Sequence, residues 1–171
     1  MGAMPAEFFF MKPIFFILPC MIIASACGPK AQPLPPEQRA QLEKLRQELQ
    51  QTLGEKYYEP VPAATPAQIK RGGELFAELC AGCHGARGDG KIAHSEGLLQ
   101  QPSNFMDPAQ ATFFSEQARL QIIRQGIAGT AMMGWAEALP ESDLLAIYLH
   151  VRQLYETAKP SSLLQEIFRK N

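Results

Sequence analysis

The sequence predicts a small all-α domain preceded by a separate linker helix, on three observations. Apolar residues recur at three- and four-residue spacing in several segments, as they do on one face of an α-helix. No segment shows the alternating apolar and polar pattern of a half-buried strand. Stretches rich in Gly, Pro, Asn and Asp separate the periodic segments, so long loops are expected between the helices.

The composition fits one domain with appendages. The chain has 171 residues, of which 46% are hydrophobic and 19% charged, so a packed core is within reach. The formal net charge of -1 gives no electrostatic case for nucleic-acid binding. Prolines crowd between Pro29 and Pro66, which predicts a linker in that part of the chain.

Residues 1–26 have the pattern of a secretory signal peptide. Lys12 precedes a short apolar run, and small residues then lead into Cys27. The run is shorter than the ~20 apolar residues that a membrane-spanning helix needs. Met11 is expected to be the true start, with residues 1–10 as an upstream extension. The mature domain is therefore expected outside the cytoplasm.

The letters "ASAC", which end at Cys27, resemble a bacterial lipobox, although Ala24 stands where leucine is more usual. In such signals the cysteine is lipid-modified and becomes the mature N-terminus. Gly28 follows Cys27, which favours retention at the outer over the inner membrane of a Gram-negative cell. The resemblance implies a periplasmic lipoprotein. An ordinary signal peptide and an uncleaved anchor remain the alternatives.

Residues 27–66 are expected to form a lipid-anchored linker that contains one amphipathic helix at 37–53. Gly54 is a stop signal for that helix. The helix would dock on its own domain, stand as a solvated spacer or bind a partner. Its apolar face is marked by four leucines: Leu42, Leu45, Leu49 and Leu53.

The domain proper is expected at residues 67–159. Its first helix begins with a capping box, in which Thr65 and Gln68 satisfy each other's backbone N–H groups. Gly72 and Gly73 in mid-helix each cost roughly 1 kcal/mol against alanine, so a close approach by another helix is expected there.

The later helices are separated by irregular stretches. Ser115 can cap a helix that ends at Gly126, and long loops occupy residues 85–114 and 131–139. Loops this long predict something large for them to wrap, since the domain alone would have a thin core. The last helix carries one apolar stripe: Leu144, Ile147, Tyr148, Val151 and Tyr155.

The motif "CAGCH" holds the two cysteines of the domain, Cys80 and Cys83, followed at once by His84. A thioredoxin-like thiol pair normally lies near a βαβ pattern, which is missing here. A zinc site needs a fourth ligand or a water, and adjacent Cys83 and His84 suit one tetrahedral centre poorly. Covalent haem c fits every position, because the cysteines can form thioethers with two vinyl groups and His84 can ligate the iron.

The domain resembles a class I (monohaem) cytochrome c. Gly72 and Phe76 stand eight and four positions before Cys80, as in the family's N-terminal helix. Leu145 and Tyr148 match its C-terminal helix, and "GTAMMGW" is similar to its distal methionine loop. The resemblance implies three to four helices wrapped around one covalently bound haem, with the two terminal helices crossing at the glycine.

The resemblance also implies a methionine as the second axial ligand of the iron. Met132 is the candidate, with Met133 where the family usually has proline, and Met133 is the rival ligand. Without that proline the backbone conformation of the loop is expected to be less restricted. Met106 is expected to serve packing, and His94 to be a solvated loop residue rather than a bis-histidine ligand.

Two further residues are assigned by the same resemblance. The backbone of Pro102 is expected to accept a hydrogen bond from the second ring nitrogen of His84, which would fix the tautomer. Trp135 is expected either to line the pocket and bond a haem propionate or simply to fill the core.

The resemblance and the signal sequence imply a single-haem c-type cytochrome that acts as a membrane-tethered electron carrier in a periplasmic respiratory or redox chain, with redox proteins as partners. No enzymatic activity, small-molecule substrate or nucleic acid is expected. The alternative is a fixed haem subunit of a larger oxidoreductase or terminal oxidase, with helix 37–53 and the tail at 160–171 as assembly elements. A haem enzyme or gas sensor with an open iron position is a third reading, opposed by Met132.

Overall fold

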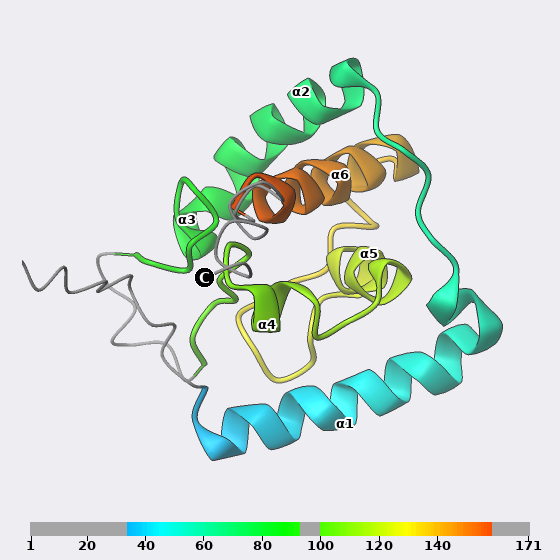
Figure 1. Cartoon of the computed structure of the whole chain (residues 1–171), viewed down its shortest axis with the longest axis vertical. Coiled ribbons are helices and arrows are strands. Elements are labelled where there is room, and N and C mark those ends of the chain that lie inside the picture. The colour runs from blue at the N-terminus through cyan, green and yellow to red at the C-terminus, as the bar shows by residue number, and fades with distance from the viewer. Residues whose placement is uncertain (1–33, 93–99, 159–171) are drawn as a thin grey trace, which may run out of the picture. The chain divides into compact units, whose positions relative to one another are not determined.

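A computed structural model of the chain describes residues 34–92 and 100–158 (Figure 1). These residues form helices and connecting segments, with no strand among them, so the predicted all-α fold is confirmed. The elements are α1 (Pro36–Leu53), the 3-10 helix η1 (Gly54–Tyr58), α2 (Pro66–Leu75), the π turn η2 (Phe76–Cys80), α3 (Ala81–His84), α4 (Pro108–Ala111), α5 (Glu116–Gln125) and α6 (Glu141–Ala158).

Several predictions lie outside the described residues. These are the signal peptide, the lipidation of Cys27, the loop position of His94 and the tail at 160–171. Within the described ranges, no helix is long and apolar enough to cross a membrane.

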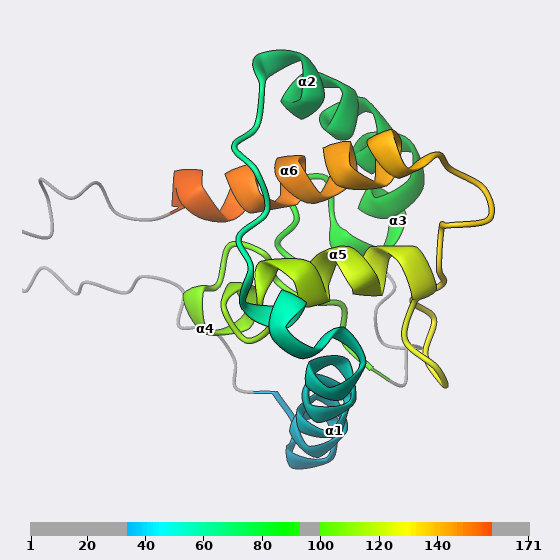
Figure 2. The ribbon, with the colours of Figure 1, turned by 90° about the vertical axis from the view of Figure 1, so that its right-hand side faces the viewer.

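Helices α2 and α6 cross in close contact, in both views of the ribbon (Figures 1 and 2). A Cβ atom on Gly72 would fall on the backbone carbonyl of Ala146 and within 2.9 Å of the His150 Cβ atom. Only a residue without a side chain allows this approach, which confirms the expected crossing at Gly72. The Thr65–Gln68 capping box is also present and fixes the start of α2.

The main core lies between α2, α5 and α6. Tyr148 and Ile147 of α6 are at most 1% exposed, and Leu75 and Leu120 bring in the faces of α2 and α5. The apolar stripe predicted for the last helix therefore faces the core. The buried members of this cluster are Val61, Leu75, Leu120, Ile123, Leu144, Ile147, Tyr148 and Leu149.

Helix α1 packs on α5 rather than standing apart as a solvated spacer, so docking on its own domain is seen, and partner binding stays a prediction. Leu49 of α1 and Tyr57 of η1 are buried together with Ala118 of α5. Leu45 and Phe114 add to this second apolar cluster. Figure 2 shows the resulting order of helices, with α5 between α6 and α1.

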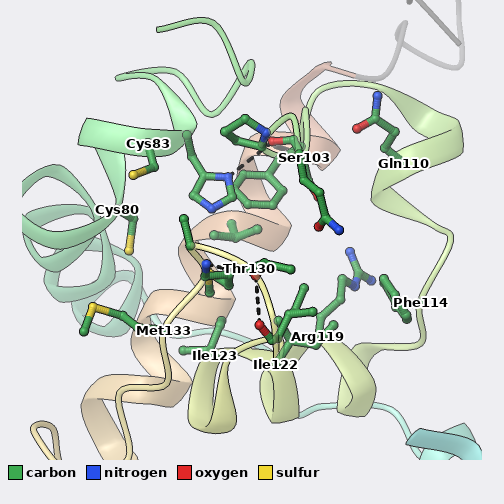
Figure 3. Close-up of a pocket in the computed structure, with 18 of the residues that line it drawn as sticks. Cys80, Cys83, Ser103, Gln110, Phe114, Arg119, Ile122, Ile123, Thr130 and Met133 are labelled. Carbon is green, nitrogen blue, oxygen red and sulfur yellow. Dashed lines mark hydrogen bonds between the residues drawn. The ribbon is translucent and has the colours of Figure 1, made fainter. Parts of the chain in front are cut away.

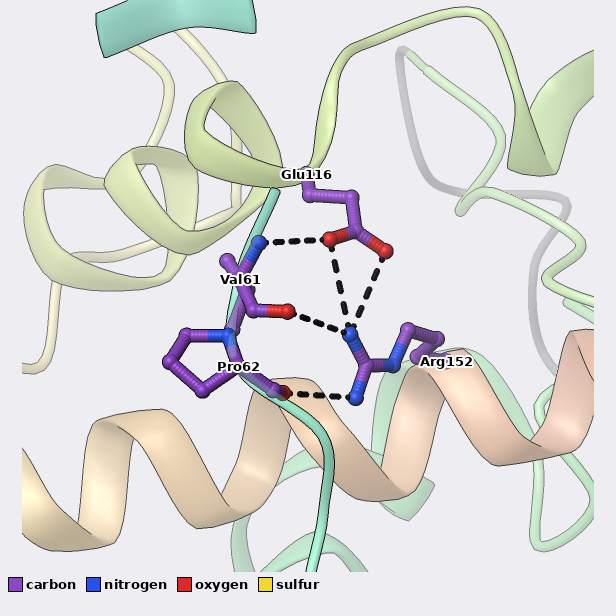
Figure 4. A network of polar contacts seen from close by, with 4 residues as sticks. All are labelled: Val61, Pro62, Glu116 and Arg152. Carbon is purple, nitrogen blue, oxygen red and sulfur yellow. Dashed lines mark hydrogen bonds and ion pairs between the residues drawn. The ribbon is translucent and has the colours of Figure 1, made fainter. Parts of the chain in front are cut away.

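The segment between η1 and α2 is held firmly although its sequence reads as a linker. Val61 is only 4% exposed, and its N–H donates to Glu116 Oε2 at 2.7 Å. Arg152 of α6 donates to the carbonyls of Val61 at 3.1 Å and Pro62 at 2.9 Å (Figure 4). Arg152 also pairs with Glu116 at 3.3 Å, so one network joins α5, α6 and this segment.

Candidate functional site

A π turn places the residues of the CAGCH motif. Residues Phe76–Cys80 widen from α-helical to π-helical hydrogen bonding before α3 begins. Such a turn takes in one extra residue, which rotates every later side chain by about 100° around the helix axis. π turns occur often at functional sites. Here the turn ends at Cys80, so it sets the direction in which the motif faces.

His84 is fixed from two sides. Its Nδ1 lies 3.3 Å from the carbonyl oxygen of Ser103 (Figure 3), and its ring stacks on Phe105 with centroids 4.7 Å apart. Burial lowers the pKa of His84, against a smaller opposing effect of the Ser103 carbonyl, so the ring is neutral at neutral pH. With Nδ1–H donating to the carbonyl, Nε2 is the nitrogen left to ligate a metal.

The acceptor for His84 corrects one prediction. The carbonyl of Pro102 was expected in this role, but the structure gives it to Ser103, the next residue. The Pro102 carbonyl instead faces Gly90, where an added Cβ would come within 2.8 Å of it. Pro102 still lines the cavity beside His84. The family resemblance predicted the correct loop. It did not predict which of two successive carbonyls in that loop faces the His84 ring.

The two motif cysteines are free thiols and lie on the same side of the cavity (Figure 3). Cys83 is exposed, whereas Cys80 is half-buried. Burial, with a smaller contribution from Cys83, raises the pKa of the Cys80 thiol to about 11. Cys80 is thus a protonated thiol at neutral pH, and neither thiol is held in a disulfide.

A mostly apolar cavity of about 450 Å³ opens in front of these residues. Its size is within the range of about 300–1,000 Å³ that is usual for small-molecule and cofactor sites. Side chains from α1, α5 and α6, from the motif segment at 76–84 and from the loop after α5 surround it. Its lining includes Phe76, Cys80, Cys83, His84, Phe105, Ile123, Thr130, Met132, Met133, Trp135 and Tyr148.

The loop that carries Met132 and Met133 is folded back on the end of α5. Gly126 ends α5 at a φ of +73°, which favours glycine, and it faces Met133 in an isolated antiparallel bridge. The N–H of Ile127 donates to the Met132 carbonyl at 2.8 Å. These backbone contacts restrict the conformation of the loop at Met133, where the family usually has a proline.

Further hydrogen bonds fix the loop on either side of the methionines. The Met132 N–H donates to the Thr130 hydroxyl at 3.0 Å, and that hydroxyl donates to the Ile127 carbonyl at 2.9 Å. The Trp135 N–H donates to the carbonyls of Ile123 and Arg124 at 3.1 Å each. The backbone at Met132 is therefore held by bonds that run back to α5.

The two methionines differ in exposure. Met133 is 62% exposed, whereas Met132 is half-buried, and both line the cavity. A thioether ligand has to be withdrawn from water and directed at the iron, which suits Met132 better. Met106 is 37% exposed and does not line the cavity. Which sulfur binds iron stays a prediction.

Trp135 lines the cavity and also packs against the main core. Trp135 therefore has contacts that suit both expected roles, lining the pocket and filling the core. The hydrogen bond from its indole N–H to a propionate stays a prediction.

The donors and the cavity fit a covalently bound haem. Two free thiols, one imidazole held by its Nδ1 and two thioethers surround one apolar cavity. The zinc alternative finds no such support. Among the described residues, no three His, Cys, Asp or Glu side chains gather closely enough to hold a metal ion.

Sequence reasoning missed three participants in the site. Phe105 supports the His84 ring, and the phenyl–imidazole stacking has no signature in the spacing of the chain. Arg119 of α5 and Gln38 of α1 also line the cavity. Their positions depend on how α5 and α1 pack, which periodicity alone does not specify.

The domain that carries the site matches a known protein family. Residues 67–151, just under half of the chain, match the family described as cytochrome c oxidase, cbb3-type, subunit III. The matched segment runs from the start of α2 into α6 and includes the whole CAGCH motif and methionine loop, but not α1. No curated protein matches the chain.

Proposed function

We propose, on the premise that residues 67–151 are a c-type cytochrome domain with one covalently bound haem c, that the protein is a membrane-tethered electron carrier of a periplasmic redox chain. The observation that carries the proposal is the cavity between His84 and Met132, with the thiols of Cys80 and Cys83 at its side. A haem held in this way exchanges single electrons and needs no site for a substrate.

Bound haem supplies an iron that alternates between the ferrous and ferric states. His84 provides Nε2, and the bond of its Nδ1 to Ser103 keeps the ring from turning between the two states. Met132 provides a thioether, which favours ferrous iron and raises the potential. The apolar walls exclude water, which also favours the less charged ferrous state.

Electrons are proposed to pass at the side of the cavity where Cys83 and Met133 are exposed. Donor and acceptor proteins would dock there, because Cys83, which would hold the haem through a thioether, is exposed on that side.

An optical redox titration of the purified holoprotein tests this function. We expect one reversible one-electron couple and six-coordinate, low-spin spectra in both states. High-spin iron that binds carbon monoxide readily would contradict the proposal and favour a sensor or enzyme with an open iron position.

A fixed subunit of a terminal oxidase is the second candidate, favoured by the description of the matched family. The apolar face of α1, considered as an assembly element, is already used on α5. A pull-down from detergent-solubilised membranes separates the two candidates. A stoichiometric partner complex supports the subunit, and a free monomer supports the carrier.

Membrane attachment through lipidated Cys27 is part of the proposal and rests on the sequence alone. Labelled fatty acid should enter the wild-type protein but not the Cys27→Ala variant. Cys20→Ala is the matched control and should be labelled like the wild type. Equal labelling of all three proteins would remove the lipoprotein assignment.

A further inference from the structure

Arg119 of α5 is a cation at the wall of an apolar cavity. Its side chain is half-buried, and its guanidinium lies over the Tyr148 ring, 5.6 Å from the centroid. Its Nε is buried and finds no hydrogen-bond partner among the described residues. No acidic side chain in residues 34–92 and 100–158 forms an ion pair with Arg119.

The acidic residue on the same helix, Glu116, already has other partners. Glu116 accepts from the Val61 N–H and pairs with Arg152. Withdrawing part of a guanidinium from water without a hydrogen-bond partner is unfavourable, so a half-buried cation at an apolar wall is normally paired with an anion. The cavity that Arg119 lines is therefore expected to receive a negatively charged group.

Arg119 lies across the cavity from the cysteines. Figure 3 shows Cys80 and Cys83 on one side, and Arg119 with Gln110 and Phe114 on the other. In haem the two vinyl groups and the two propionates lie on opposite edges of the macrocycle. Thioether bonds to the cysteines direct the vinyl edge to their side, which leaves the carboxylates on the side of Arg119.

We propose that Arg119 pairs with a haem propionate and that helix α1 covers this pair. The inference rests on the proposed function, since it requires the haem to be in place. It assigns a role to a charged residue and to a helix that the functional account so far leaves without one.

Helix α1 reaches the cavity with two side chains, Gln38 and Leu42. Gln38 is only 8% exposed, and its Nε2 donates to the Gln101 carbonyl at 2.9 Å. A further hydrogen bond joins Gln41 of α1 to Gln100. Helix α1 is thus fastened to the loop beside the cavity as well as to α5. A helix in this position would keep water from the far edge of the cavity, and charge interactions are stronger where water is absent.

The first experiment compares the midpoint potential of the holoprotein with that of the Arg119→Gln variant. A cation near the haem disfavours the ferric state, so its removal lowers the potential. We expect the equilibrium constant for reduction to fall by roughly tenfold, which is about 59 mV for a one-electron couple. The resonance Raman bending bands of the propionates should shift in the same variant.

Two further variants control this result. Arg124→Gln removes a cation from the same helix, but Arg124 is paired with Glu141 outside the cavity. We expect it to leave both the potential and the propionate bands unchanged. Arg119→Lys keeps the charge and should restore most of the potential. Unchanged potential and bands in Arg119→Gln, or an equal shift in Arg124→Gln, would overturn the assignment.

The covering role of α1 is tested with Leu49→Ala, which weakens the packing of α1 on α5. Leu49 is 7% exposed and packs α1 on α5, outside the cavity. If α1 shields the pair from water, Arg119→Gln should shift the potential less in the Leu49→Ala background than in the wild type. Equal shifts in both backgrounds would remove the covering role of α1. A wild-type protein without low-spin haem would instead contradict the proposed function itself.

Discussion

Gly72 of α2 lies with its backbone directly against the carbonyl of Ala146 in α6. This contact fixes the distance between the helix that leads into the haem-attachment motif and the helix that forms the back of the core. Because α2 continues through the π turn into α3, the crossing also determines where Cys80 and His84 stand.

Gly72→Ala should therefore destabilise the holoprotein strongly. The added methyl group has no space unless the helices separate, and overpacking of this kind costs about 1–3 kcal/mol or more. Denaturant unfolding monitored at the haem absorbance checks the value. Gly82→Ala is the matched control, because a Cβ there meets nothing within 4 Å. Equal stability of the two variants would contradict the close crossing.

The signals that sequence reasoning read correctly are local. The capping box at Thr65, the Ser115 cap and the Gly126 stop each depend on a few neighbouring residues, and each is present. The CAGCH spacing is equally local, and the cavity forms in front of it. The close approach at Gly72 was also predictable, since a mid-helix glycine needs a compensating contact.

The features that escaped prediction depend on tertiary packing. The leucine periodicity gave α1 an apolar face but not α5 as its partner. The π turn before the motif corresponds to no pattern in the local sequence. The choice of Ser103 rather than Pro102 as the partner of His84 depends on the path of a loop with no periodicity.

The ion pair between Arg71 and Asp143 predicts a dependence of stability on pH. Arg71 Nη2 lies 2.5 Å from Asp143 Oδ2, and hydrogen bonding from Arg71 holds the pKa of Asp143 below its ordinary value of 3.8. A lowered carboxyl pKa stabilises the fold above the unfolded-state value and loses this effect as the pH falls through the folded-state value. The pair should therefore contribute at neutral pH and not in acid.

Asp143→Asn should lower the denaturation midpoint at pH 7, and the gap to the wild type should close as the pH falls below 3.8. Arg71→Gln should show the same gap with the same closure, since it removes the other half of the pair. Unfolding curves between pH 7 and pH 3 check this. A gap of constant size across the range would contradict the assigned role.

The network around Arg152 predicts a loss of stability when its charge is removed. Arg152→Met keeps most of the alkyl chain but deletes the bonds to Val61, Pro62 and Glu116. Hydrogen bonds that involve a charged group contribute about 1.5–3 kcal/mol each, so a loss of at least about 2 kcal/mol is expected. Denaturant unfolding measures it. Arg39→Met, at an exposed position, should change stability by less than about 0.5 kcal/mol.

The segment at Val61 should also become accessible to proteolysis in Arg152→Met, because it loses its hold on α6. If the variant resists proteolysis there as the wild type does, the burial of Val61 and its bond to Glu116 hold the segment without Arg152.

The central claim is that His84 and Met132 hold one low-spin haem iron between them. The most direct measurement is the methionine–iron charge-transfer band of the ferric protein in two single variants. We expect Met132→Ala to abolish the band, while Met133→Ala, which alters a 62% exposed side chain, retains it. Loss of the band in Met133→Ala with its retention in Met132→Ala would contradict the assignment of the ligand.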